Sequence, residues 1–183
     1  MVVAGLLFLA FAYFAVGQAA VNRNGAQTAA DAAALAAAQE ARDGLAGLWV
    51  EDVLDPTKWQ DIFDGNRLGL SDPCWRAHEL AAMNDATVDD CAPVGLRFSV
   101  TVQANKTAGD SVIPVTSTTK AHADAVAVIE PLCTFEPPGE AAEEDLPTLT
   151  CEDEDRNREW EFDPDDLGDL PRPEDLFDVH LAD

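Results

Sequence analysis

The stretch that decides the fold runs from Val2 to Asp43 and reads VVAGLLFLAFAYFAVGQAAVNRNGAQTAADAAALAAAQEARD. Residues 2–21 carry no charge, and a helix of that length rises about 30 Å, the hydrocarbon thickness of a bilayer. The residues that follow are rich in Ala and other strong helix formers. The pattern predicts one long helix, with a transmembrane part over residues 1–21 and an Ala-rich extension over residues 22–50.

Two other interpretations of residues 2–21 are a cleaved signal peptide and a buried core helix. A signal peptide needs a basic region before a shorter apolar run, and no Lys or Arg precedes this one. The rest of the chain is too Ala-rich and acidic to wrap a buried helix. We therefore expect a retained membrane helix, and the missing basic residues suggest that Met1 is not the natural start. For the extension, an ordinary solvated Ala-rich helix remains an alternative.

Small side chains cover nearly every face of the extension. Helices with such surfaces can approach one another closely, as they do in membranes. We therefore predict assembly through lateral helix contacts, with a homo-oligomer as one outcome. The predicted helix-assembly face consists of Ala15, Ala19, Ala26, Ala29, Ala30, Ala33 and Ala37.

Charge excludes some partners and marks a second region. The chain has 183 residues, 35 of them acidic and 11 basic, for a net charge of −24. Binding to nucleic acid or to anionic lipid through a basic patch is excluded by this balance. Residues 130–183 contain 20 acidic side chains and three Arg. High charge, recurrent Pro and no sustained apolar period predict an acidic, largely disordered tail over residues 136–183, although its few apolar side chains could dock on the head or on a partner.

Between these regions, residues 51–135 are predicted to form a small α+β head with a short antiparallel sheet. Asp55-Pro56 and Asp72-Pro73 are helix-start signals. The segment LRFSVTVQA, residues 96–104, alternates with a period of two, as a half-buried strand does. Residues 121–130 and 86–91 predict two more strands. The predicted head core consists of Trp59, Phe63, Trp75, Leu80, Phe98, Val100 and Val102.

The four cysteines are predicted to form disulfides rather than a zinc site, because no CxxC motif is present. Cys74 opens a predicted helix and Cys91 ends the strand after it, so a hairpin would bring them together. Such a bridge would contribute about 3 kcal/mol in the chain-entropy model. Cys133 and Cys151 have a similar spacing and could tether the start of the tail. Three pairings remain open, and four reduced thiols fit poorly with an extracytoplasmic location.

Catalytic and metal-binding motifs are incomplete in this sequence. His78-Glu79-Leu80-Ala81-Ala82 begins like the zinc-protease motif HExxH but lacks its second His. The acidic runs at residues 152–155 and 163–166 lack the spacing of a calcium loop. We therefore predict a protein that is not an enzyme and has no cofactor and no metal site.

The N-terminal third resembles the TadE- and TadG-like proteins of tight-adherence pilus assembly. The resemblance is carried by AQTAADAAALAAA (Ala26–Ala38) directly after the apolar helix, and more loosely by ELAAMNDATVDDC (Glu79–Cys91) followed by alternating strands. It covers residues 1–50 well and 71–130 loosely. It implies a non-catalytic minor pilin or pseudopilin, with its N-terminus at the cytoplasmic face, its head and tail outside the cell, and other pilin-like subunits as partners.

The sequence departs from the pilin pattern at the processing site. Pilin-type subunits are usually cut by a prepilin peptidase near a Glu, whereas here Gly5 occupies that area and no Glu precedes Glu40. Either the site lies upstream of Met1, or the protein is retained in the membrane without processing. The alternative function is a single-pass anchored extracellular binding module whose acidic tail binds Ca²⁺ or a basic partner.

Overall fold

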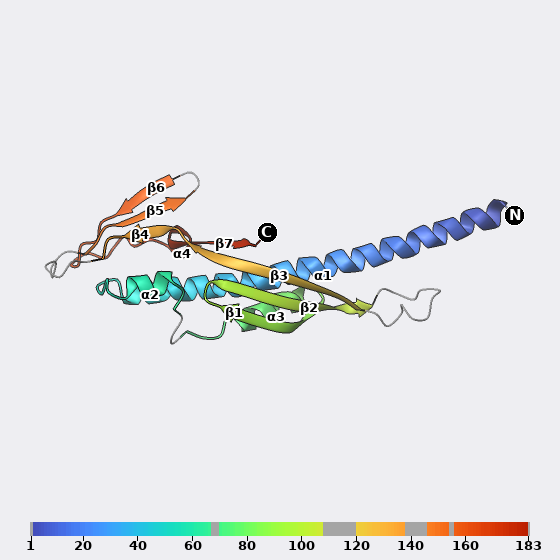
Figure 1. Ribbon diagram of the computed structural model, residues 1–183, viewed down its shortest axis with the longest axis horizontal. Helices are drawn as coiled ribbons and strands as arrows, with labels where there is room; N and C mark the ends of the chain where they lie inside the picture. Colours follow the sequence, from blue (N-terminus) through green and yellow to red (C-terminus); the bar gives the residue numbers. More distant parts are fainter. Residues whose placement is uncertain (1, 67–69, 108–119, 138–145, 154–155, 183) are drawn as a thin grey trace.

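A computed structural model describes residues 2–66, 70–107, 120–137, 146–153 and 156–182. The molecule is elongated, and one long helix, α1 (Val2–Glu51), projects from it at the N-terminal end (Figure 1). The other elements, in chain order, are α2 (Trp59–Phe63), α3 (Cys74–Met83), β1 (Ala86–Val94), β2 (Arg97–Thr107), β3 (Lys120–Pro131), β4 (Cys133–Phe135), β5 (Leu149–Asp153), β6 (Arg156–Trp160), α4 (Pro173–Leu176) and β7 (Phe177–Leu181).

α1 agrees with the prediction of a single long helix, because its Ala-rich sequence contains no Pro to interrupt it. The prediction that it spans a membrane is wrong: within the described residues, no helix combines the length and the apolar character that a membrane crossing requires. The fold class is therefore corrected to an α+β protein with a long N-terminal helix.

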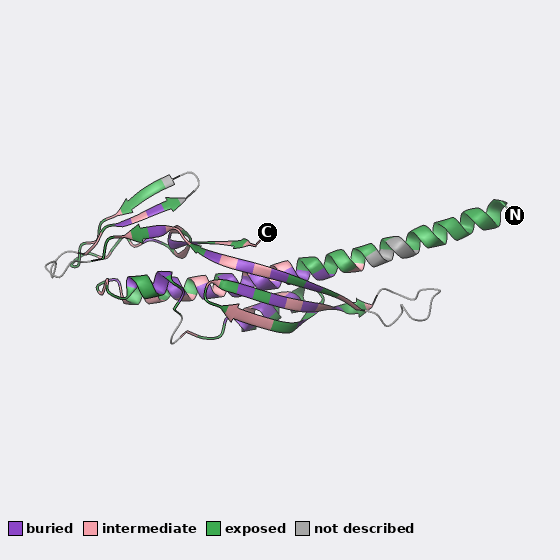
Figure 2. Ribbon diagram, viewed as in Figure 1, coloured by how far each residue is buried: buried purple, intermediate pink, exposed green. Residues whose placement is uncertain are grey.

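The head is built on an antiparallel sheet with the strand order β1-β2-β3-β7. The predicted alternation is present in β2, where Phe98, Val100 and Val102 are buried. On β3, the buried residues Ala125 and Ala127 continue the same inner face. The part of α1 after residue 25 packs against β3, β2 and α3, so the core lies between the long helix and the sheet (Figure 2).

The prediction of a largely disordered acidic tail is also wrong. Residues 149–153 form β5 and residues 156–160 form β6, and both join β4 in a second antiparallel sheet. Further along, β7 pairs with β3 from Leu181 opposite Ala127 to Phe177 opposite Pro131. Leu149, Leu176 and Phe177 are buried, which explains why the segment folds: its few apolar side chains reach the head core while its acidic groups stay at the surface.

Most of the predicted core residues are buried, with two exceptions on α3. Trp59, Phe63, Phe98, Val100 and Val102 each have no more than 4% exposure. The structure corrects the placement of Trp75, which is 50% exposed, and of Leu80, which is only partly buried. The physical reason is that α3 packs through its small residues Cys74, Ala77 and Ala81, and these define a face that turns Trp75 outward.

Candidate functional site

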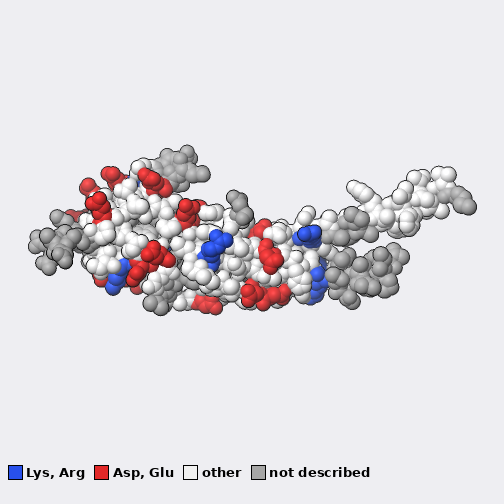
Figure 3. All heavy atoms as spheres, in the orientation of Figure 1, with Lys and Arg blue, Asp and Glu red and all other residues white. Residues whose placement is uncertain are grey.

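The projecting end of α1 is an apolar surface that the head does not cover. We call residues Val2–Phe14 the apolar end of α1. Its large side chains are exposed, among them Phe8 at 73% and Phe11 at 66%. Figure 3 shows this end without an acidic or basic side chain. Covering a Leu or Phe side chain of this kind contributes about 1.5–3 kcal/mol, so the apolar end is a strong candidate for binding a partner.

Local contacts fix the point at which α1 leaves the head. Asn22 Nδ2 donates a hydrogen bond to the Thr107 carbonyl at 2.9 Å. Four residues on, Ala26 is the first buried residue among those of the helix whose side chains the structure describes. Upstream of Asn22, the described side chains of α1 are exposed. The long helix therefore has two parts, one packed into its own head and one that extends beyond it.

This division corrects the predicted helix-assembly face. Ala29, Ala30, Ala33 and Ala37 have 0% exposure and Ala26 has 1%, and they belong to the core shared with the sheet. They are therefore not available to another subunit. α1 packs against β3, and the buried residues of both elements include several Ala, so the helix and the sheet can approach closely. The side chains of Ala15 and Ala19 lie outside the described residues.

Replacing Ala33 by Leu is expected to lower the free energy of unfolding by about 1–3 kcal/mol, because extra methylene groups in a packed core force strained rotamers or backbone shifts. Urea unfolding followed by circular dichroism measures the change. Gln39→Leu is the matched control, since Gln39 is exposed on the same helix. An equal stability of the two variants would show that Ala33 is not enclosed by the head.

Two disulfides connect the parts of the head. Cys74 is bonded to Cys91, joining α3 to β1, and Cys133 is bonded to Cys151, joining β4 to β5. The prediction of disulfides is thus confirmed. Of the three pairings that the sequence left open, the structure contains Cys74–Cys91 together with Cys133–Cys151. We call residues 136–183, the predicted tail, the acidic segment. In the second pair the two cysteines are direct cross-strand neighbours, so this bond ties the acidic segment to the end of the head.

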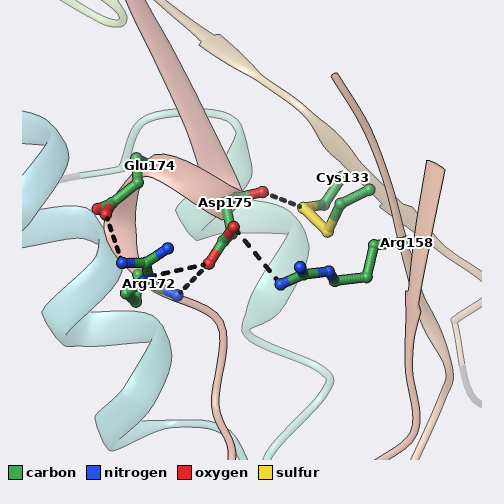
Figure 4. A network of polar contacts seen from close by, with 6 residues as sticks. Cys133, Arg158, Arg172, Glu174 and Asp175 are labelled. Atoms are coloured by element: carbon green, nitrogen blue, oxygen red, sulfur yellow. Dashed lines mark hydrogen bonds and ion pairs between the residues drawn. A yellow bond between two sulfur atoms is a disulfide. The ribbon is translucent and has the colours of Figure 1, made fainter. Parts of the chain in front are cut away.

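A polar network joins β6 to α4 within the acidic segment (Figure 4). Asp175 lies at its centre: its Oδ2 accepts a hydrogen bond from the Arg172 backbone N–H at 2.9 Å, and its Oδ1 lies 3.8 Å from Arg158 Nη1. The Asp175 carbonyl oxygen is 3.3 Å from Cys133 Sγ. Arg172 also approaches Glu174, with 3.5 Å between Nη1 and Oε1. Two of the few cations in this region, Arg158 and Arg172, thus hold β6 and α4 together.

The incomplete zinc-protease motif lies at the surface of α3 and is not part of a metal site in the described residues. His78 and Glu79 are exposed on α3, and within the described ranges no group of three or more His, Cys, Asp or Glu side chains is placed to hold a metal ion. The pKa of Lys58 is raised by its hydrogen bond to Asp52, with 2.6 Å between Nζ and Oδ1. The pKa of Asp55 is lowered, chiefly by the Thr57 hydroxyl donating to it at 2.5 Å. These groups belong to an exposed turn before α2.

Comparison with known proteins points to the same helix. Residues 1–40 match the model of a family described as putative Flp pilus-assembly TadE/G-like. No curated protein and no solved structure matched the chain. The match covers the apolar end of α1 and the first part of the helix that enters the core, and the remainder of the head lies beyond it. The chain is therefore similar over these residues to proteins of pilus assembly, whose setting is the cell envelope or surface.

Proposed function

We propose that the chain is a non-catalytic component of a pilus-assembly system, similar to a minor pilin or pseudopilin, and that it joins its assembly through the apolar end of α1. The observation that carries this proposal is the exposure of that end, where Val2, Phe8 and Tyr13 are 73–84% exposed. The family match over residues 1–40 supports it, because it covers the same part of the helix.

The distribution of charge supports contact through helices rather than through heads. The chain carries a net charge of −24, while residues 2–21 contain no charged side chain. Heads of like charge repel one another, whereas charge-free helices can pack side by side without that cost. Partners of fitting chemistry are the apolar helices of other pilin-like subunits, a second copy of this chain among them.

The disulfides support a location of the head outside the cytoplasm. Disulfide bonds persist in oxidising compartments and are rare where glutathione keeps thiols reduced. Both pairs, Cys74–Cys91 and Cys133–Cys151, lie in the head. A head presented at the cell surface, with incorporation in a filament, is consistent with these bonds and with the family's role.

The double variant Leu7→Glu/Phe11→Glu tests the proposal. The two side chains are 56% and 66% exposed and four residues apart on one face of the helix. Covering both in an assembly would contribute about 3–6 kcal/mol, so two carboxylates there are expected to remove the protein from filaments. Cells carry the protein with an epitope after Asp183, are sheared, and are separated into filament, membrane and soluble fractions.

The matched control is Gln39→Glu/Gln60→Glu, which adds the same two charges at exposed positions of the packed part of α1 and of α2. We expect the control to remain in the sheared filament fraction and its epitope to be lost when intact cells are treated with protease. The proposal is wrong if the Leu7/Phe11 variant is recovered from filaments like the control, or if the unmodified protein is absent from them.

A further inference from the structure

Three of the chain's few cations lie together where α1 leaves the head. Arg23 on α1 follows Asn22, whose Nδ2 donates to the Thr107 carbonyl at 2.9 Å. Lys106 precedes Thr107 on β2, and Lys120 lies opposite Thr107 on β3. The three cations thus come from three elements and lie around one point. We call Arg23, Lys106 and Lys120 the basic collar.

Most of the collar's charge is not neutralised by a neighbour in the described part of the chain. Lys106 Nζ lies 2.6 Å from Asp85 Oδ2, whereas the other two collar cations are in none of the described ion pairs. The next carboxylates on their elements are Asp31, eight residues along α1, and Asp124, four residues along β3. These spacings correspond to about 12–13 Å of helix or strand. The collar is therefore a local positive patch on a chain whose net charge is −24.

The opposite end of the molecule carries the acidic segment. Residues 130–183, which include this segment, contain 20 acidic side chains and three Arg. β5 and β6 lie at the end away from the projecting part of α1 (Figure 1). Figure 3 shows basic side chains where the projecting helix leaves the head and acidic side chains gathered at the opposite end. The two ends of the elongated head thus have opposite local charge.

A hollow of about 840 Å³ opens on this acidic end. Its lining includes the carboxylates of Glu136, Glu159 and Glu161, and its described lining residues include no Lys or Arg. All three Glu are exposed and belong to none of the described ion pairs. Phe135 and Leu146 add apolar surface, on which the stems of Lys or Arg side chains can lie. We call this feature the acidic hollow.

We propose that the basic collar of one copy of the chain binds the acidic hollow of a second copy. Arg23 and Lys120 of one copy would bring their charged groups to Glu159 and Glu161 of the other, and this complementarity would fix the register of the contact. The like net charge of two heads opposes contact side by side, whereas contact end to end brings opposite local charges together.

Such a contact joins two different surfaces, so each copy keeps one collar or one hollow free for the next copy. A contact of this kind that does not close into a ring generates an open linear assembly. Because collar and hollow lie at opposite ends of the elongated head (Figure 1), the copies would be staggered along the axis of α1. This inference concerns contacts between heads and does not depend on the proposed role of the apolar end.

The first measurement detects the contact directly. Equal amounts of isotope-labelled and unlabelled full chain, in a non-ionic detergent with more micelles than chains, are treated with a carbodiimide that joins amines to carboxylates in contact. Mass spectrometry is expected to find Lys120 of a labelled chain joined to Glu159 or Glu161 of an unlabelled one. Lys106 is the internal reference, because its contact with Asp85 lies within one chain and its cross-link should carry no mixed label.

Reversal of charge tests the pairing of the two surfaces. Arg23→Glu/Lys120→Glu and Glu159→Lys/Glu161→Lys are each expected to lower the association constant about tenfold, because two exposed ion pairs become two repulsive pairs. Sedimentation equilibrium in the same detergent measures it. A chain with all four changes has the original net charge and should associate like the unmodified chain. The Glu159/Glu161 variant is less negative than the unmodified chain, so an effect of net charge alone would strengthen its association instead.

A monomeric chain without mixed-label cross-links would overturn the proposal. Stronger association of the Glu159/Glu161 variant would also overturn it, and so would weak association of the chain with all four changes. If the chain binds vesicles of anionic lipid and only the collar reversal abolishes that binding, while the Glu159/Glu161 variant associates normally, the collar is a lipid contact and the second copy is excluded. None of these outcomes affects the proposed function, because detergent covers the apolar end here and the Leu7/Phe11 variant tests that end in cells.

Discussion

Replacing Trp59 by Ala is expected to lower the free energy of unfolding by about 3–5 kcal/mol, the usual cost of deleting a large buried aromatic side chain. Trp59 has 0% exposure. Its ring centroid lies 5.3 Å from those of Trp49 and Phe135 and 5.8 Å from that of Phe162, so one side chain joins α1, β4 and the acidic segment. Its Nε1 donates to the Asp52 carbonyl at 3.1 Å, and the substitution also removes that donor.

Trp75→Ala is the matched control for this prediction. It removes the same side chain from α3, where the indole is 50% exposed and contacts the Arg76 guanidinium at 5.5 Å. Surface substitutions usually change stability by about 0.5 kcal/mol or less. Urea unfolding of both variants, followed by far-ultraviolet circular dichroism, gives the comparison. A similar loss in the two variants would contradict the assignment of Trp59 to the core and of Trp75 to the surface.

The elements of the head were predictable because their signals are local. Alternation over residues 96–104 has only one explanation, a strand with one buried face, and β2 buries Phe98, Val100 and Val102 as that pattern requires. The helix and strand that follow Asp72-Pro73 likewise bring Cys74 next to Cys91. Alternation and helix-start motifs depend on residues that are neighbours in the sequence, and not on which element packs against them from the other side of the core.

The role of the Ala residues on α1 was not predictable in this way. A surface of small side chains allows close approach by any partner, whether another subunit or a sheet of the same chain. In this chain the partner of the Ala-rich surface is its own sheet, because the inner positions of β3 include the small residues Ala125 and Ala127. These residues lie about ninety positions away from Ala33 and Ala37 in the sequence, so the pairing of small surfaces appears only in three dimensions.

The acidic segment shows how composition can hide a weak local signal. Its charge predicts disorder, yet FDVHL, residues 177–181, alternates with a period of two and forms β7. Cys151 was a second clue, since a disulfide partner in the head would anchor the segment. Both clues are small beside the 20 acidic side chains of residues 130–183, but together they bring the segment onto the head.

Removing the disulfide between Cys133 and Cys151 by changing both residues to Ala is expected to destabilise the acidic segment by about 3 kcal/mol, the chain-entropy value for a loop of this size. The bond is the direct cross-strand link between β4 and β5. β5 and β6 are paired only within their own three-stranded sheet. Native-state hydrogen exchange should therefore be faster at the amides of β5 and β6, while the amides of β1 and β2 keep their protection.

The second disulfide supplies the matched control, because the two pairs have nearly the same spacing. Cys74 and Cys91 are 17 residues apart, and Cys133 and Cys151 are 18 apart, so the chain-entropy contributions are nearly equal. Their places in the fold differ, since α3 and β1 both belong to the head around α1. Changing Cys74 and Cys91 to Ala should therefore increase exchange in β1 and β2 and lower the stability of the whole head. If both double variants accelerate exchange in the same amides, the acidic segment and the head unfold as one unit, and the disulfide between Cys133 and Cys151 does not act locally.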